Sequence, residues 1–152
     1  MLFRSETAES SDNVEKLRGK HVLLAEDNNL NAEIAVAILE KTGLVIDRVE
    51  DGIQCVSRIE QMPSDTYDLI LMDIQMPNMD GYKATQCIRH LNDKKKAEIP
   101  IIAMTANAFE EDKKRAINAG MNGHIAKPVE IDKLISEISK YTEKDDEKIN
   151  KA

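Results

Sequence analysis

The sequence of 152 residues contains no tryptophan, and three Tyr and two Phe are its only large aromatic residues. A core must therefore be aliphatic, and one hydrophobic core can be built at this length. The two cysteines, Cys55 and Cys87, form no CxxC pair and no cluster with histidine, so we expect free thiols and no zinc site. No apolar run approaches the roughly 20 residues of a membrane span, and the first residues lack the apolar stretch of a signal peptide. We therefore expect a soluble, cytoplasmic protein.

Basic residues are fewer than acidic residues in this sequence. Acidic residues outnumber basic ones by 28 to 21, which gives a net charge of -7. This charge would repel a phosphodiester backbone and argues against direct binding to nucleic acid. Neither GxxxxGK[ST] nor GxGxxG occurs, so these nucleotide-binding motifs are absent from the sequence.

Both ends of the chain are polar and have no sustained apolar period. We interpret residues 1–19 as an N-terminal tail or linker and residues 143–152 as a charged C-terminal tail. The remaining residues, 20–142, are long enough for one folded domain.

Short apolar runs alternate with amphipathic stretches between these ends, which is typical of βα units around a parallel sheet. In the first helix, Ile34, Ala37 and Ile38 share the face expected to be buried. Lys94-Lys95-Lys96 is interpreted as a solvated turn. We expect an α/β fold with a doubly wound, five-stranded parallel sheet and five helices. The predicted strands are 21–25, 44–49, 69–72, 99–104 and 124–126, and the predicted helices are 30–42, 52–62, 82–91, 110–119 and 130–141.

Polar residues stand at the carboxyl ends of four of these strands. Parallel strands all end at the same edge of a sheet, where doubly wound folds bind ligands, so these side chains should converge. Three carboxylates brought together repel one another unless a cation compensates. Ligands that are all oxygens suit Mg²⁺, for which Mn²⁺ would substitute. The residues are Glu26 and Asp27 after the first strand, Asp73 after the third, Thr105 after the fourth and Lys127 after the fifth.

Phosphoryl transfer is a chemistry that this set would support. A carboxylate is a known nucleophile towards phosphorus, and the oxygens of the transferring group need neutralisation by Mg²⁺, an ammonium group and a hydroxyl. Taken singly, each residue also has a structural explanation, since Asp73 or Thr105 would cap a helix and Pro128 is common before one. Their combination at one edge favours the functional interpretation.

Four segments resemble the receiver domain of two-component response regulators, over about residues 20–141. They are Glu26-Asp27-Asn28, LMDIQMPNMDGY around Asp73, IIAMTANA around Thr105 and GHIAKP around Lys127. Residues 28–31 resemble more specifically the receivers of hybrid histidine kinases. The resemblance implies a flavodoxin-like fold with strand order 2-1-3-4-5.

The resemblance also implies roles for individual residues. Asp73 would accept a phosphoryl group from a phosphohistidine on a sensor histidine kinase or a histidine phosphotransfer domain. Asp27 and Asp73 would bind Mg²⁺ directly, together with the backbone carbonyl of Gln75, while Glu26 would act largely through bound water. Lys127 would contact the phosphoryl oxygens.

The switch between signalling states is implied by the same resemblance. The Thr105 hydroxyl would move towards the phosphoryl group and change the surface that includes Phe109, Ile117 and His124. His124 departs from the family, which often has an aromatic residue there; it is either part of the switch or an exposed edge-strand residue. Gln75 and Asn107 would tune the lifetime of the phosphorylated state.

Two other classes of protein share parts of this pattern. A phosphatase or phosphotransferase with an aspartyl nucleophile usually has a second Asp two residues later, where this chain has Gln75. An interaction module independent of phosphorylation would be marked by loss of site residues, and none is lost. We therefore expect a signalling domain and not an enzyme, limited to self-directed phosphotransfer and slow dephosphorylation. Phosphorylation-dependent self-association is a further expectation, and both a receiver excised from a larger protein and a single-domain regulator remain open.

Overall fold

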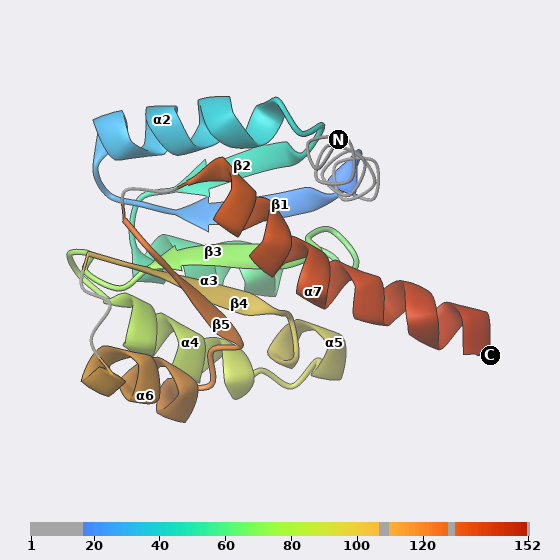
Figure 1. Ribbon diagram of the computed structural model, residues 1–152. Helices are drawn as coiled ribbons and strands as arrows, with labels where there is room; N and C mark the ends of the chain where they lie inside the picture. Colours follow the sequence, from blue (N-terminus) through green and yellow to red (C-terminus); the bar gives the residue numbers. More distant parts are fainter. Residues whose placement is uncertain (1–16, 107–109, 128–129, 152) are drawn as a thin grey trace.

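A computed structural model describes residues 17–106, 110–127 and 130–151, with side chains described up to Tyr141. Its centre is a five-stranded parallel sheet with strand order β2-β1-β3-β4-β5 (Figure 1). The doubly wound α/β sheet and its order are thus confirmed. The strands are β1 (His21–Ala25), β2 (Val45–Val49), β3 (Leu69–Asp73), β4 (Ile101–Thr105) and β5 (Gly123–Ala126).

Helices cover both faces of this sheet (Figure 1). α2 and α7 lie on one face, and α3, α4 and α6 lie on the other. Within the described ranges, no helix has the length and apolar character to cross a bilayer. The helices are α2 (Asn29–Glu40), α3 (Gly52–Gln61), α4 (Gly81–Arg89), α5 (Lys94–Ala97), α6 (Glu110–Ala119) and α7 (Ile131–Lys151).

The strands divide the core into two layers. In β1, Val22 and Leu24 pack with α2 and α7, whereas Leu23 and Ala25 pack with α3, α4 and α6. Successive side chains of a strand point to opposite faces, so a strand covered on both sides must be apolar throughout. This explains why β1, β3 and β4 are continuous apolar runs.

Short polar side chains start several of the helices at the carboxyl edge of the sheet. Asn28 Oδ1 accepts a hydrogen bond from Asn31 N at 2.9 Å, and Asp80 Oδ1 accepts one from Lys83 N at 2.8 Å. Such caps satisfy backbone N–H groups that have no partner inside the helix. The loops that begin the helices therefore also gather polar groups at this edge.

The expected number of helices was wrong, because the described part of the chain has six. The additional helix, α5, includes the lysine run that was interpreted as a turn. Asp93 begins it by accepting hydrogen bonds from the backbone N–H groups of Lys95 and Lys96. Lys94 and Lys95 are exposed, as expected of a solvated segment.

The predicted buried face of the first helix was also wrong. α2 buries Ala32, Ala35 and Leu39, whereas Ile34 is 51% exposed. Apolar residues stand on both faces of this helix, so periodicity alone could not decide between them. The small alanines allow a closer approach to the sheet, and the larger isoleucine remains on the surface.

Both ends of the fold extend beyond the limits expected from the sequence. α7 continues to Lys151, beyond residue 141, because the segment has no Gly or Pro and many good helix formers. At the other end, Leu17 lies in the segment interpreted as a tail, yet it is fully buried among the residues that pack with α2 and α7. Gly19 N also donates a hydrogen bond to Gly43 O at 2.9 Å.

The two cysteines carry free thiols, as expected. Cys55 is buried in the core, and this burial raises the pKa of its thiol to about 12. Cys87 is half-buried.

Leu17 should contribute to stability as a core residue does. We expect Leu17→Ala to lower the free energy of unfolding by about 2–5 kcal/mol, because it leaves a cavity in a packed core. Leu30→Ala is the matched control, since Leu30 is 64% exposed, and should change it by less than about 0.5 kcal/mol. Guanidinium denaturation measures both; equal effects would show that Leu17 does not belong to the core.

Candidate functional site

A hollow of about 300 Å³ lies at the carboxyl ends of the strands. All five side chains predicted to converge there line it: Glu26, Asp27, Asp73, Thr105 and Lys127. They come from the ends of β1, β3, β4 and β5. The parallel sheet therefore brings together residues that are up to 101 positions apart in the sequence.

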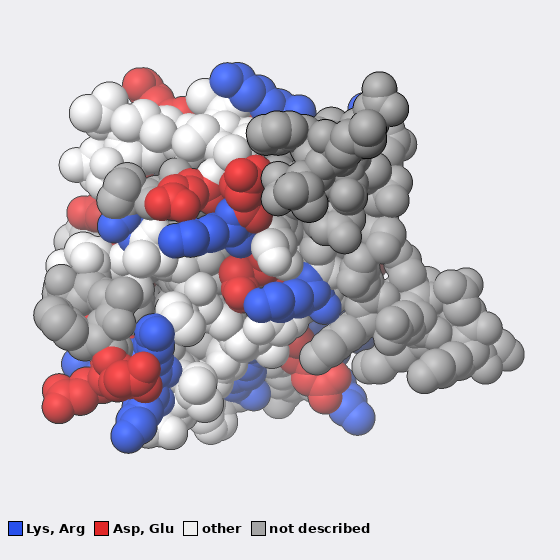
Figure 2. All heavy atoms as spheres, viewed as in Figure 1, with Lys and Arg blue, Asp and Glu red and all other residues white. Residues whose placement is uncertain are grey.

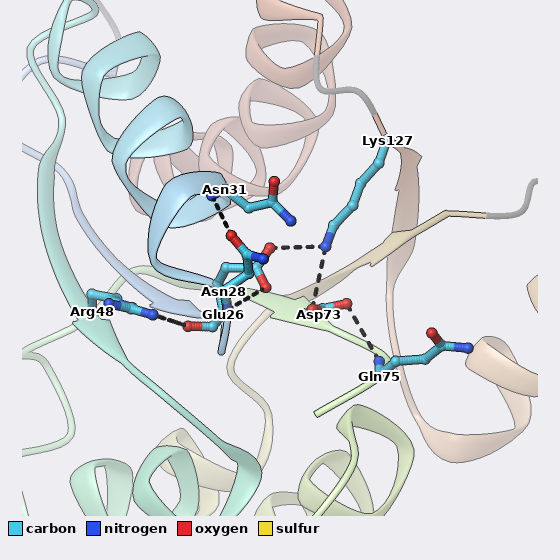
Figure 3. Close-up of polar contacts among 7 residues, drawn as sticks. All are labelled: Glu26, Asn28, Asn31, Arg48, Asp73, Gln75 and Lys127. Atoms are coloured by element: carbon cyan, nitrogen blue, oxygen red, sulfur yellow. Dashed lines mark hydrogen bonds and ion pairs between the residues drawn. The ribbon is translucent and has the colours of Figure 1, made fainter. Parts of the chain in front are cut away.

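The Lys127 ammonium group lies between two buried carboxylates (Figure 3). Its Nζ is 2.8 Å from Glu26 Oε1 and 3.2 Å from Asp73 Oδ2. The Lys127 side chain is 22% exposed, so the pair of contacts is partly shielded from water. Screening is weaker there than on an open surface, and removal of the ammonium group would leave the two buried carboxyl groups without their positively charged partner.

The three groups change one another's ionisation. Burial, with a hydrogen bond shared with Glu26, raises the pKa of Asp73 to about 7. Burial acts in the same direction on Glu26, but contacts with Asp73 and Lys127 outweigh it and leave the pKa of Glu26 below its ordinary value. Burial would lower the pKa of Lys127, yet the two carboxylates hold that pKa above its usual value. Asp73 is thus the carboxyl that a further cation would ionise most effectively.

The acidic groups fit a hard divalent cation. Glu26, Asp27 and Asp73 each offer a carboxylate oxygen, and these oxygens lie within 4.8 Å of one another. Asp27 is exposed, so the group opens to solvent on one side. A donor set of oxygens alone, with access for water, suits Mg²⁺.

Gln75 lies beside Asp73 in the loop that follows β3. Its backbone N–H points at Asp73 Oδ1, at 3.3 Å, and its side chain extends away from the carboxylate (Figure 3). The loop closes through a 2.9 Å hydrogen bond from Gly81 N to Ile74 O. Glycine is required at residue 81, because a Cβ there would lie 2.4 Å from the carbonyl oxygen of Asp73.

The switch residues of the sequence analysis lie on β4 and β5. Thr105 is buried, and its carbonyl accepts a 2.8 Å hydrogen bond from Lys127 N, which joins the ends of the two strands. His124 is half-buried in β5 and stands in register with Ala103 of β4. Asn107, Phe109 and Pro128, for which the sequence also predicts roles, lie outside the described residues.

Arg48 is a supporting residue that sequence reasoning missed. From β2, it donates two hydrogen bonds to the carbonyl oxygen of Glu26, of 3.0 Å from Nε and 2.7 Å from Nη2, and one of 2.9 Å from Nη1 to Asn29 Oδ1. The guanidinium group therefore fixes the backbone that carries the acidic pair (Figure 3). A single arginine on an edge strand carries no sequence signal for this role.

Asn28 has a second function beside its capping of α2. Its backbone N–H donates to Glu26 Oε2 at 3.3 Å, whereas Lys127 contacts Oε1 of the same carboxylate. The rim of the hollow includes two further residues that were not predicted, Tyr82 and Asp112. Arg115 of α6 stacks over the Tyr82 ring, 4.4 Å from its centroid.

Known proteins share this fold and sequence pattern. The family described as "Response regulator receiver domain" matches residues 22–139. Hybrid signal transduction histidine kinase L of Dictyostelium discoideum is 38% identical over 141 residues, covering 91% of this chain and 8% of the relative. Transcription factor SKN7 of Saccharomyces cerevisiae is 39% identical over 136 residues, covering 89% of this chain and 21% of the relative. The chain thus spans only a small part of either protein.

Solved structures resemble the chain along most of its length. The receiver domain of a sensor histidine kinase from Pseudomonas aeruginosa, which has a magnesium ion coordinated in its active-site cleft, is 39% identical with a TM-score of 0.73, over 82% of this chain and 98% of that one. The receiver domain of Ssk1 from Saccharomyces cerevisiae was crystallised with the histidine phosphotransfer protein Ypd1. It is 27% identical with a TM-score of 0.75, over 83% of this chain and 90% of that one. Together with the match to residues 22–139, these similarities show that the chain belongs to the response regulator receiver domain family.

Proposed function

We propose that this receiver domain accepts a phosphoryl group on Asp73 from a phosphohistidine, switches conformation and then slowly dephosphorylates itself. The observation that carries the proposal is the placement of the buried Asp73 carboxylate against Lys127 in a hollow lined by two further acids. The donor would be a sensor histidine kinase or a histidine phosphotransfer domain. The chain would act as a signalling domain, without turnover of an external substrate.

The acidic residues would hold Mg²⁺, with Mn²⁺ as a substitute. Asp27 and Asp73 would bind it directly with the backbone carbonyl of Gln75, and Glu26 would contribute largely through bound water. When bound, the ion supplies positive charge that stabilises the phosphoryl oxygens.

Asp73 would act as the nucleophile. One carboxylate oxygen forms a bond to phosphorus while the bond between phosphorus and the donor imidazole nitrogen breaks, and that nitrogen keeps the electron pair. The Lys127 ammonium group then pairs with the phosphoryl oxygens. Attack by water on phosphorus would later release inorganic phosphate and restore the carboxylate, and Gln75 would influence the rate of that step.

The new charge would change the surface of the domain. A phosphoryl group adds roughly -1.5 to -2 charges and three acceptor oxygens. The Thr105 hydroxyl would follow these oxygens, and the Thr105–Lys127 backbone contact would carry the movement to β5. The surface formed by α6, β5 and α7 includes Ile117, which is 65% exposed, and would mediate self-association after phosphorylation.

The phosphodonor would dock on the start of α2. Leu30 and Ile34 are 64% and 51% exposed there, next to the loop that carries Asp27. The surface over this end of α2 is largely uncharged in Figure 2. Neighbouring exposed apolar side chains on one helix favour a binding surface, and the Ssk1 receiver that resembles this chain was crystallised with such a phosphotransfer protein.

Phosphorylation at Asp73 can be tested by intact mass. Incubation with acetyl phosphate and Mg²⁺ should add about 80 Da, the mass of one phosphoryl group, because the buried carboxylate becomes nucleophilic once charge around it is balanced. Asp73→Asn and EDTA should each abolish the adduct. An adduct of the same size on Asp73→Asn would contradict the assignment, and hydrolysis of a broad panel of phosphoesters would favour a phosphatase.

Docking on α2 predicts that a substitution there slows phosphotransfer from a protein donor but not from a small phosphodonor. Leu30→Asp should slow transfer from a phosphorylated histidine phosphotransfer domain, one first shown to phosphorylate the wild-type chain, by at least about fivefold, because a buried contact is lost. Phosphorylation by acetyl phosphate should be unchanged. Ile117→Asp is the matched control, an equally exposed residue on α6. Equal slowing by both substitutions, or slowing of both phosphodonors, would place the docking surface elsewhere.

A further inference from the structure

The loop between β3 and α4 is anchored at its far end to the start of α3. Asn78 Nδ2 donates a 2.8 Å hydrogen bond to Asp51 Oδ2, and Gly52 N donates a 3.0 Å hydrogen bond to Met79 O. Asp51 and Gly52 follow β2, a strand that supplies none of the five predicted site side chains. A part of the chain outside the hollow is thus connected to the loop that carries Gln75.

Asp51 uses its two carboxylate oxygens for two different purposes. Oδ1 caps α3 by accepting a 2.8 Å hydrogen bond from Gln54 N, and Oδ2 accepts from Asn78. The residue is only 7% exposed, so water cannot easily replace either partner. The hydrogen bonds from Gln54 and Asn78 hold the pKa of Asp51 below its ordinary value, and the group is charged at neutral pH.

The backbone of both segments is adapted to this contact. Asn78 has a φ of 67°, a left-handed conformation that costs energy for most residues and that, among residues other than glycine, Asn and Asp tolerate best. At Gly52, a Cβ would lie 2.4 Å from Met79 O, so a side chain there would force the segments apart. Two special positions in one contact indicate that its geometry is tightly constrained.

The near end of the loop is anchored at the site itself. Gly81 N bonds to Ile74 O, and Gln75 N lies 3.3 Å from Asp73 Oδ1. Gln75 therefore lies between a fixed end at Asp73 and the anchor three residues later at Asn78. Any displacement at Asn78 would reach the Gln75 carbonyl through two intervening residues, one of which is the rigid Pro77.

We propose that Asp51 and Asn78 form a latch that positions the Gln75 backbone and thereby sets the affinity of the site for a divalent cation. The proposal rests on the proposed function, because it takes the Gln75 carbonyl as a ligand. Both are positioning residues: neither is among the described residues that line the hollow. Groups that orient metal ligands commonly affect metal affinity without touching the ion.

Two single substitutions should remove the hydrogen bond between Asp51 and Asn78, and one double substitution should restore it. Asp51→Ser keeps a helix-capping oxygen but is too short to reach Asn78. Asn78→Asp places a second carboxylate against Asp51 and still tolerates the left-handed backbone. The double variant Asp51→Asn/Asn78→Asp restores one donor and one acceptor with their roles exchanged and keeps the wild-type net charge. Asp93→Ser, at the exposed cap of α5, is the control for loss of a capping carboxylate.

The first readout is the affinity for Mn²⁺, which is measured from the electron paramagnetic resonance signal of the free ion. Both single variants should weaken binding by roughly 3- to 30-fold, and the double variant should return to within about twofold of wild type. Asp93→Ser should match wild type. A simple charge effect makes a different prediction, because Asn78→Asp adds a negative charge and would then bind Mn²⁺ more tightly.

The second readout is amide hydrogen exchange in EDTA, which requires neither metal nor activity. The Gly52 amide, bonded to Met79 O, should exchange at least about tenfold faster in both single variants and recover in the double variant. Wild-type affinity in both single variants, tighter binding by Asn78→Asp, or no recovery in the double variant would overturn the latch. A wild-type chain that binds no Mn²⁺ would instead overturn the proposed function, and with it the role of the latch in metal affinity.

Discussion

Positive charge at Lys127 is the constraint on which the rest of the site depends. Its ammonium group contacts Glu26 and Asp73 at 2.8 and 3.2 Å, in a hollow where three carboxylates offer oxygens within 4.8 Å of one another. Such a cluster is unfavourable without compensation, and one lysine leaves negative charge in excess. Burial first, and then the neighbouring Glu26, raise the pKa of Asp73 to about 7, and Lys127 only partly offsets them. A divalent cation would relieve the repulsion, and a phosphoryl group would then bring oxygens that Lys127 can pair with.

The fold brings these charged groups together at the carboxyl ends of its strands. Parallel strands place Asp73, Thr105 and Lys127 on one edge although they come from three separate strands, and the helix caps add polar groups beside them. The backbone around the acids is fixed from two sides. Arg48 holds the carbonyl of Glu26 from β2, and the Asp51–Asn78 contact holds the loop after Asp73 from the start of α3. Residues that never enter the hollow thus contribute to its geometry.

The strands and the five converging side chains were predictable because they follow from local patterns. An apolar run ending in an acid, a threonine or a lysine is visible in the sequence, and parallel strands force those ends together. The buried face of α2 was not predictable, because Ile34 and Leu39 are equally apolar and only packing against the sheet selects between them. Arg48 and Asp51 were missed for a related reason: each acts on a backbone or side chain distant in the sequence, and a single polar residue does not reveal its partner. The short helix α5 was not predicted either, because its only sequence signal is one capping residue, Asp93, before a lysine run that resembles a solvated turn.

The most direct measurement is a pH titration of the Asp73 side-chain carboxyl by ¹³C NMR in the metal-free chain, with Asp73→Asn to assign the signal. Burial of Asp73 beside Glu26 predicts a midpoint at about 7, which falls when Mg²⁺ is added and rises in Lys127→Met. The directions follow because both cations favour the ionised carboxylate. A midpoint near the ordinary value of 3.8, unchanged by Mg²⁺ and by Lys127→Met, would contradict the account.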